Sequence, residues 1–360
     1  MRARHFETFD ALRFFAYLKV FLLHLPITAF PVFAFLSRGG GIGVVFFFVL
    51  SGFLISYIIF QEKENTGKLN LRNFFIRRIL RIWPLYYLML LFAFCTPYLL
   101  GLLNLSSSPE GYEPDWLLYG LFLGNYQSIA LDMSPNVSPL GVMWSLCIEE
   151  HFYLIWGVLL YFVNLKRMPY IFAGGIIAAN VARVIFFQFG LGTSEILTNL
   201  DYFIYGAIPA YIIVKFPNKI ENRVLRLSKE VKRVYVLLVI GLVIVLPVIP
   251  VLVKEFLAPA VFGIAFAGLV VLFSPEKGDF RIHDRNGLSI MGRYTYGTYL
   301  FHGIWISLFI QIFSALHFSL DTAIYAIMFV GITFLCTLGS AWLSYRFFEM
   351  PFLRLKRRFY

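Results

Sequence analysis

Two histidines and one glutamate lie within long apolar runs of this sequence, where an ionisable side chain is costly. His24 follows Arg13 by eleven residues, about three helical turns, so one helix face carries both side chains. Glu149 and His302 each lie about nine residues inside an apolar run of their own, at a depth similar to that of His24. An imidazole that a carboxylate orients or charges can move a proton near neutral pH. The spacing therefore predicts a buried acid–base site formed by His24, Glu149 and His302.

Each of these residues also has a structural interpretation. His302 taken alone is equally typical of a histidine that hydrogen-bonds between membrane helices. Glu149 can instead form an ion pair with a structural arginine such as Arg183 or Arg13. A structural role explains His24 less well, because Arg13 lies on the same helix face.

A second group of charges opens the apolar run that begins near residue 79. Arg78 and Arg81 are three residues apart and share a helix face, and with Arg13 they are expected to form a cationic rim at the cytoplasmic end of the helices. Arg77 belongs to the same segment, and simple anchoring on the cytoplasmic side is an equal alternative for it. A guanidinium group binds two phosphate oxygens at once. The rim, together with Arg77, therefore favours a nucleotide-bearing donor such as coenzyme A.

These side chains require membrane-crossing helices, and the composition is typical of such helices. The 360 residues are 59% hydrophobic and only 14% charged, with a mean hydropathy of +0.76, whereas a soluble domain has about 25% charged residues. Apolar runs near 20 residues are long enough to cross a hydrocarbon core of about 30 Å. We expect an all-α, polytopic transmembrane bundle, one domain over residues 1–360, with about ten spans at 9–30, 39–61, 79–101, 140–163, 169–189, 197–214, 233–250, 255–273, 290–314 and 320–347.

The loops between the apolar runs predict the orientation. Nearly all Lys and Arg residues outside the runs fall on one side, whereas the other side carries only Arg38 and Lys254. Both termini are therefore expected in the cytoplasm. The main extracytoplasmic loop is then 102–139, and its apolar part, 115–131, is short enough to predict an interfacial or re-entrant segment. These loops account for the net charge of +11, so the expected partner is the lipid bilayer and not nucleic acid.

Cysteines and glycines add two further expectations. Cys95, Cys147 and Cys336 lie within apolar runs and form no Cys-x-x-Cys pair, so neither a disulfide framework nor a metal site is expected. The glycine-rich segment 39–43 lacks the strand and the Gly-Lys-Ser/Thr ending of a phosphate loop. Close helix packing is its expected role, because small residues let membrane helices approach one another.

Six motifs, in order from about residue 9 to residue 355, resemble those of the acyltransferase 3 family of membrane-bound acyltransferases. They are Asp10-Ala-Leu-Arg13 with His24, Gly43-Val-Val-Phe-Phe-Phe-Val-Leu-Ser51-Gly52, Arg77-Arg78-Ile-Leu-Arg81-Ile-Trp-Pro84-Leu-Tyr86, Trp144-Ser145-Leu-Cys-Ile-Glu149-Glu150-His-Phe152-Tyr153, Tyr296-Gly-Thr-Tyr-Leu-Phe-His302 and Phe348-Glu349-Met-Pro351-Phe. Three positions depart from the pattern common in the family. Val45 stands where an acidic residue is frequent, Asn199 where arginine is, and Met350 where the terminal motif has arginine.

The resemblance implies transfer of an acyl group, commonly acetyl, from cytoplasmic acyl-CoA to a carbohydrate hydroxyl. It implies a multi-pass protein of a bacterial cytoplasmic (cell inner) membrane. The expected acceptor is a surface polysaccharide such as O-antigen or peptidoglycan, a lipid-linked glycan or a glycosylated small molecule. Some family members carry an additional extracytoplasmic SGNH domain. None is expected here, because the sequence ends shortly after Pro351.

The resemblance also implies roles for the charged residues. The arginines hold the phosphates of the donor, and His24 acts as general base or as transient acyl carrier. Glu149 orients His24 or stabilises its cation, and His302 assists proton transfer or positions the acceptor. An exporter of polysaccharide or lipid-linked sugar, without chemistry, is the alternative, because intramembrane charges also line transport paths. A structural membrane subunit is a third possibility, and the sequence indicates no oligomeric state.

Overall fold

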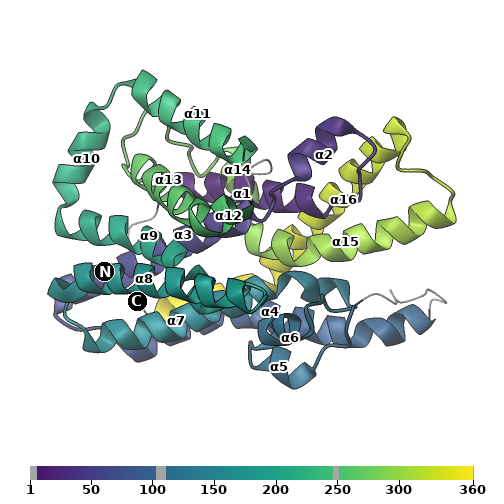
Figure 1. Cartoon of the computed structure of the whole chain (residues 1–360), viewed down its shortest axis with the longest axis horizontal. Coiled ribbons are helices and arrows are strands. Elements are labelled where there is room, and N and C mark those ends of the chain that lie inside the picture. Colours follow the sequence, from purple (N-terminus) through teal and green to yellow (C-terminus); the bar gives the residue numbers. More distant parts are fainter. Residues whose placement is uncertain (1–5, 103–110, 246–250, 360) are drawn as a thin grey trace.

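The apolar runs form helices throughout the part of the chain that the computed structural model describes, residues 6–102, 111–245 and 251–359 (Figure 1). Within these ranges no β-strand occurs, and the single β-bridge joins Tyr112 to Pro135. The prediction of an all-α fold is therefore confirmed.

The longer helices carry most of the chain, and short helices join them. In chain order they are α1 (Thr8–His24), α2 (Pro31–Ser37), α3 (Ile42–Thr66), α4 (Leu71–Leu102), α5 (Trp116–Gly120), α6 (Gly124–Leu131), α7 (Trp144–Phe162), α8 (Met168–Gln188), α9 (Ile196–Lys215), α10 (Pro217–Arg226), α11 (Lys229–Val245), α12 (Val251–Phe256), α13 (Ala258–Leu272), α14 (Gly287–Arg293), α15 (Thr295–Ala315), α16 (Ala323–Leu343) and α17 (Met350–Lys356). Short 3₁₀ turns lie at Ser138–Val142, Leu165–Arg167 and Arg357–Phe359, and a π-helical turn at Ser344–Glu349 links α16 to α17.

Seven helical stretches of the described residues are long and apolar enough to cross a membrane. They are Pro31–Thr66, Leu71–Leu102, Trp144–Phe162, Leu165–Gln188, Ile196–Lys215, Thr295–Ala315 and Ala323–Phe359. The three other expected spans coincide with the shorter helices α1, α11 and α13, of 17, 17 and 15 residues. The chain is thus a multi-helix membrane protein, whereas the number of ten spans and the orientation stay predictions.

The first helix is shorter than the expected span 9–30. It ends at His24, and Leu25 adopts an extended conformation with φ −71° and ψ 129°. The reason is Pro26, because a proline forces the residue before it out of the helical region. His24 therefore lies at the end of α1 and is exposed, not at mid-helix as the sequence suggested.

Helix α3 lies at the centre of the packing and contacts α1, α7, α9 and α13. Its closest partner is α9: a Cβ atom built on Gly52 would lie 2.0 Å from the carbonyl oxygen of Phe203, and one built on Gly206 would lie 1.9 Å from that of Val49. Gly43 approaches α1 in the same way, with 2.3 Å to the carbonyl oxygen of Ala16. The expected close packing by the small residues of this segment is confirmed.

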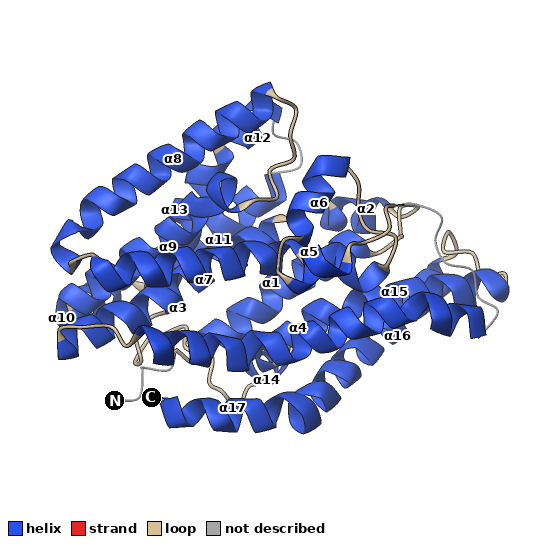
Figure 2. Cartoon of the chain, turned by 90° about the horizontal axis from the view of Figure 1, so that it is seen from below, coloured by secondary structure: helices blue, strands red, loops and turns tan. Residues whose placement is uncertain are grey.

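The segments that connect the helices differ between the two ends of the bundle. Segments assigned to the cytoplasmic side contact one another, as Glu7 does with Arg281 and Lys215 with Glu64. On the other side, residues 103–110 of the long loop lie outside the described residues, and α5 and α6 follow with five and eight residues, too few to cross a membrane. Figure 2 shows α15 and α16 running side by side, away from α8 and α10.

The glycine contact between α3 and α9 generates a stability test. Gly52→Ala places a methyl group against the Phe203 backbone and should destabilise the fold by about 1–3 kcal/mol, which thermal unfolding in detergent would register as a lower Tm. Gly331→Ala in α16 is the matched control, because a Cβ there meets nothing within 4 Å. The control should leave the Tm unchanged or raise it, and an equal loss in both variants would contradict the packing argument.

Candidate active site

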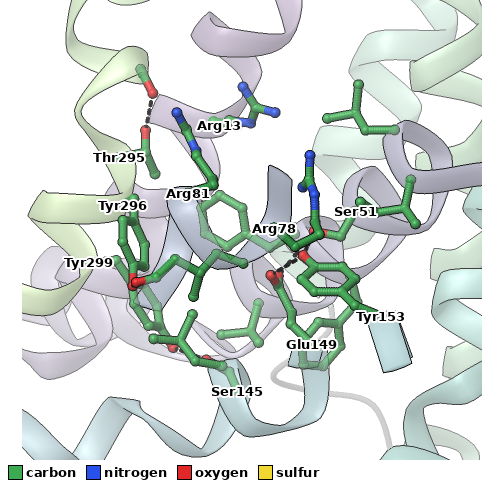
Figure 3. A pocket seen from close by; sticks show the side chains of 18 residues that line it. Arg13, Ser51, Arg78, Arg81, Ser145, Glu149, Tyr153, Thr295, Tyr296 and Tyr299 are labelled. Carbon is green, nitrogen blue, oxygen red and sulfur yellow. Dashed lines mark hydrogen bonds between the residues drawn. The ribbon is translucent and has the colours of Figure 1, made fainter. Parts of the chain in front are cut away.

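A polar cavity of about 150 Å³ lies among α1, α3, α4, α7, α14 and α15 (Figure 3). Its lining combines a polar set and an apolar set. The polar residues are Arg13, Ser51, Arg78, Arg81, Ser145, Glu149, Tyr153, Thr295, Tyr296 and Tyr299, and the apolar residues are Val44, Phe47, Phe48, Leu54, Ile55, Ile82 and Leu146, with Gly292 completing the wall. Charged groups in a wall of this kind mark a ligand site more often than a packing defect.

Three arginines from two helices meet at this cavity, as the sequence predicted. Arg13 comes from α1 and pairs with Asp10, one turn earlier on the same helix. Arg78 and Arg81 come from the first half of α4, and the guanidinium carbon of Arg78 lies 5.8 Å from the centre of the Tyr153 ring. In Figure 3 the three guanidinium groups gather along one side of the cavity, and Ser145 lies on the opposite side.

Glu149 is the one carboxylate in the described lining of the cavity. Its two oxygens accept hydrogen bonds from different helices, 3.1 Å from Ser51 Oγ on α3 and 2.5 Å from the Tyr153 hydroxyl one turn along α7. The alternative ion pairs considered for Glu149 do not form, because Arg183 pairs with Asp201 and Arg13 with Asp10. Asp10 and Glu149 together oppose the three guanidinium groups, so the cavity keeps an excess of positive charge, which favours an anionic ligand.

Two charged residues near the carboxyl terminus extend this electrostatic environment. Lys356 on α17 lies within electrostatic range of Arg13, Arg78 and Arg81. Glu349 is buried in the π-helical turn, accepts a hydrogen bond from Ser344 at 3.2 Å, and interacts electrostatically with Arg81. The sequence signal for Glu349 was the terminal motif. No sequence signal indicated Lys356, because α17 contacts α4 only through the tertiary packing.

Arg77 occupies a different environment from its two neighbours in the motif. Its guanidinium is buried, donates to Glu62 at 3.2 Å and to the main-chain oxygen of Phe359 at 2.7 Å, and does not belong to the cavity lining. Adjacent helical residues point about 100° apart, so Arg77 faces the end of α3 and the carboxyl-terminal segment when Arg78 faces the cavity. The geometry therefore favours the structural interpretation of Arg77 over a place on the cationic rim.

The two histidines of the prediction lie in contact, outside the lining of the arginine cavity. His302 Nε2 lies 3.4 Å from His24 Nδ1. His302 Nδ1 is 2.7 Å from the Tyr299 carbonyl oxygen, and His24 Nδ1 is 2.9 Å from that of Val20. A carbonyl oxygen only accepts hydrogen bonds, so in the neutral rings both Nδ1 atoms carry the proton. His302 Nε2 is then an acceptor facing His24, and Nε2 of His24 keeps a free lone pair.

Glu149 does not join the histidine pair, which corrects the expectation that it orients His24. Helix α1 ends at His24, so this residue reaches the far end of the helix, whereas Glu149 is held by Ser51 and Tyr153 in the cavity. Tyr299 connects the two groups: its side chain lines the cavity, and its carbonyl oxygen binds His302. Its hydroxyl is fixed by Ser145 Oγ at 2.7 Å.

Sequence reasoning missed several polar members of the cavity wall. Tyr153 lies four residues after Glu149, a spacing that places both side chains on one helix face. Ser51 and Ser145 were part of the quoted motifs without a role, and Tyr299 gave no charge signal. Within the described ranges, no group of three or more His, Cys, Asp and Glu side chains is arranged to hold a metal ion.

Comparison with known proteins identifies the family of the chain. A family model described as an acyltransferase domain, that of the acyltransferase 3 family, matches residues 6–345. The chain belongs to this family, as its six motifs predicted.

Relatives include enzymes named for a cell-wall acceptor. A peptidoglycan O-acetyltransferase of Listeria monocytogenes serovar 1/2a is 34% identical over 173 residues, 46% of this chain and 26% of the relative. A Bacillus subtilis (strain 168) protein, provisionally named as a peptidoglycan O-acetyltransferase, is 36% identical over 162 residues, 44% of this chain and 24% of the relative. A Staphylococcus aureus (strain COL) protein, provisionally named as an O-acetyltransferase, is 27% identical over 371 residues, 98% of this chain and 58% of the relative. The chain thus spans between a quarter and three fifths of these relatives, and no solved structure matches it.

The different surroundings of Arg77 and Arg78 generate a stability prediction. Arg77→Ala removes charge-assisted hydrogen bonds to Glu62 and to the Phe359 carbonyl, so it should destabilise the protein by about 1.5–3 kcal/mol. Arg78→Ala is the control from the same helix turn, and it should change the Tm in detergent less. A larger loss of Tm in Arg78→Ala than in Arg77→Ala would contradict this assignment.

Proposed function

We propose that this protein is a membrane O-acyltransferase that moves an acetyl group from cytoplasmic acetyl-CoA to a hydroxyl of a cell-surface carbohydrate. The observation that carries the proposal is the pairing of a cationic cavity with an adjacent, oriented histidine pair. Membership of the acyltransferase family and the names of the relatives support the reaction type.

The cavity fits the phosphates of an acyl-CoA donor. Arg13, Arg78 and Arg81 supply guanidinium forks that bind phosphate oxygens in pairs. Glu149 is fixed by Ser51 and Tyr153, which limits its contact with an anion. Arg78 and Arg81 follow the loop that the charge distribution assigns to the cytoplasm, where acyl-CoA is found. Acyl-CoA supplies the acyl group in activated form, as a thioester.

His24 is suited to receive a proton from the acceptor hydroxyl. The contacts of Nδ1 with Val20 and His302 fix the tautomer and leave Nε2 as the basic nitrogen. The same Nε2 lone pair would attack the thioester if His24 were a transient acyl carrier. The general-base role and the acyl-carrier role therefore use one atom. His302 acts as a positioning residue, because its Nε2 accepts from His24 and its own Nδ1 is held by Tyr299.

Glu149 takes a different role in this mechanism from that expected of it. Its hydrogen bonds join α3 to α7 at the cavity, and its charge opposes the arginine rim. We propose that it keeps the guanidinium groups in place when no donor is bound and sets the shape of the cavity.

A carbohydrate acceptor reaches His24 from the extracytoplasmic side. His24 is exposed at the end of α1, next to the segment that contains α2, and the donor cavity opens among helices on the other side of Tyr299. Donor and acceptor therefore approach the histidine pair from opposite directions. The relatives named for peptidoglycan support a bacterial cell-wall or surface glycan as the acceptor class, and hence a bacterial cytoplasmic membrane as the location.

Replacement of His24 tests the chemistry. Membranes that contain the wild type or His24→Ala would be incubated with acetyl-CoA labelled on the acetyl group, and alkali-labile label on the glycan fraction would be counted. His24→Ala should lose about 10²–10⁴-fold in rate, the usual contribution of a general base. His302→Ala should lose less, because it frees the His24 ring without removing it.

His283→Ala, in an exposed loop, is the control and should retain full transfer. Full transfer by His24→Ala would remove this residue from catalysis. An exporter, the alternative function, would show no dependence on acetyl-CoA in any variant.

Replacement of Arg81 tests donor binding. Arg81→Ala should raise the KM for acetyl-CoA about tenfold, since one charge-assisted contact is worth about 1.5–3 kcal/mol. The KM for the glycan should stay the same. Arg293→Ala, an exposed arginine at the end of α14, is the control and should change neither value. An unchanged KM for acetyl-CoA in Arg81→Ala would contradict the proposed donor site.

A further inference from the structure

A second polar cavity, of about 280 Å³, lies at the start of α3, whereas the arginine cavity extends further along that helix. It is bounded by the start of α3, by α8 and the start of α9, and by α12 and α13, which Figure 2 shows next to α8. The loops around it are those that the charge distribution assigns to the extracytoplasmic side. It shares no residue with the first cavity, and the proposed donor site leaves it without a role.

The wall of this outer cavity contains a buried arginine with an unused donor. The Arg183 side chain is only 4% exposed and pairs through Nη2 with Asp201. Its Nη1 is buried without a hydrogen-bond partner among the described residues. The guanidinium carbon lies 5.5 Å from the centre of the Tyr202 ring, which also lines the cavity. A buried N–H without an acceptor is costly, so the site favours a ligand that brings an oxygen to Arg183.

The remaining polar groups of the wall suit a ligand with many hydroxyls. The Asn199 amide nitrogen donates to the main-chain oxygens of Thr193 at 2.7 Å and Glu195 at 2.8 Å, which fixes the side chain. This leaves its carbonyl oxygen as an acceptor. Glu255 adds a carboxylate, and Tyr202 adds an aromatic face with a hydroxyl.

The charge of the outer cavity differs from that of the arginine cavity. Asp201 neutralises Arg183, and Glu255 adds a negative charge, so the wall carries no excess of cations. A phosphate or nucleotide is therefore disfavoured here, whereas a neutral sugar ring, with donors and acceptors on its edge and an apolar face, is matched.

A glycine turn connects this cavity to His24. Gly39 and Gly41 line the cavity, and Gly40 between them packs against α1. A Cβ atom built on Gly40 would lie 2.2 Å from Cβ of Leu23, the residue before His24. The wall of the cavity thus touches α1 directly beside the proposed base.

We propose that the outer cavity is an acceptor subsite that binds one neutral sugar unit of the glycan, next to the unit that is acylated at His24. This deepens the proposed function and rests on it for the identity of the neighbouring reaction centre. Arg183, Asn199, Tyr202 and Glu255 are the recognising residues, and the glycine turn joins the wall of this subsite to α1 one residue before His24.

The test measures sugar binding without any donor. The full-length chain in lipid nanodiscs would be titrated with the tetramer of N-acetylglucosamine by isothermal titration calorimetry. Tyr202→Ala and Glu255→Gln should each weaken binding about tenfold, the loss expected for a removed hydrogen-bond or stacking contact. Arg183 is left intact, because its removal would strand the buried Asp201. Tyr170→Ala, with a side chain 80% exposed on the outside of α8, and Arg81→Ala should bind the tetramer like the wild type.

The outcomes separate this proposal from the proposed function. Weakened binding in Tyr202→Ala but not in Tyr170→Ala supports the subsite, even if no acetyl transfer is found, in which case only the reaction is wrong. Equal binding by Tyr202→Ala and the wild type, or no saturable binding by the wild type, overturns the subsite. If the subsite is overturned but acetyl-CoA-dependent transfer is still measured, the proposed reaction stands and its acceptor binds elsewhere.

Discussion

The absence of water from the hydrocarbon core is the constraint on which this structure depends. Each charge within an apolar run must find a partner inside the bundle or line a cavity, since isolation costs several kcal/mol. Arg183 meets this demand with Asp201, and Glu149 with Ser51 and Tyr153. Arg78 and Arg81 meet it by lining a cavity. These charges of the described helices therefore mark the arginine cavity and the outer cavity.

Those cavities differ in charge, and the difference assigns them to different ligands. The inner one collects arginines from α1 and α4 around a single carboxylate, so it suits the phosphates of a donor. The outer one balances Arg183 with Asp201 and adds amide, phenol and carboxylate groups, so it suits a neutral glycan. His24 and His302 lie between these environments, beyond Tyr299 and beside the glycine turn. Under the proposed function, the acyl group would pass from the inner cavity to the outer one at this histidine pair.

Helix α3 makes this arrangement possible because it separates and supports both cavities. Ser51 and Phe47 face the inner cavity, and Ile42 and Val45 face the outer one. Gly52 lets α9 approach so closely that Phe203 contacts the α3 backbone, and Gly43 does the same for α1. The small residues of α3 therefore fix the distance between the two sites as well as the core packing.

The sequence by itself determined the all-helical membrane fold, the family and the meeting of Arg13, Arg78 and Arg81, because hydropathy and helical spacing are local properties of the chain. It also predicted that His24 and His302 lie at one site, although α1 ends at His24 because of Pro26. Tertiary structure alone decided that Glu149 belongs with Ser51 and Tyr153, that Arg77 holds the carboxyl-terminal segment, and that Arg183 meets Asp201. Those partners come from different helices, and helix rotation and pairing are set by the packing of side chains far apart in sequence, which no local pattern records.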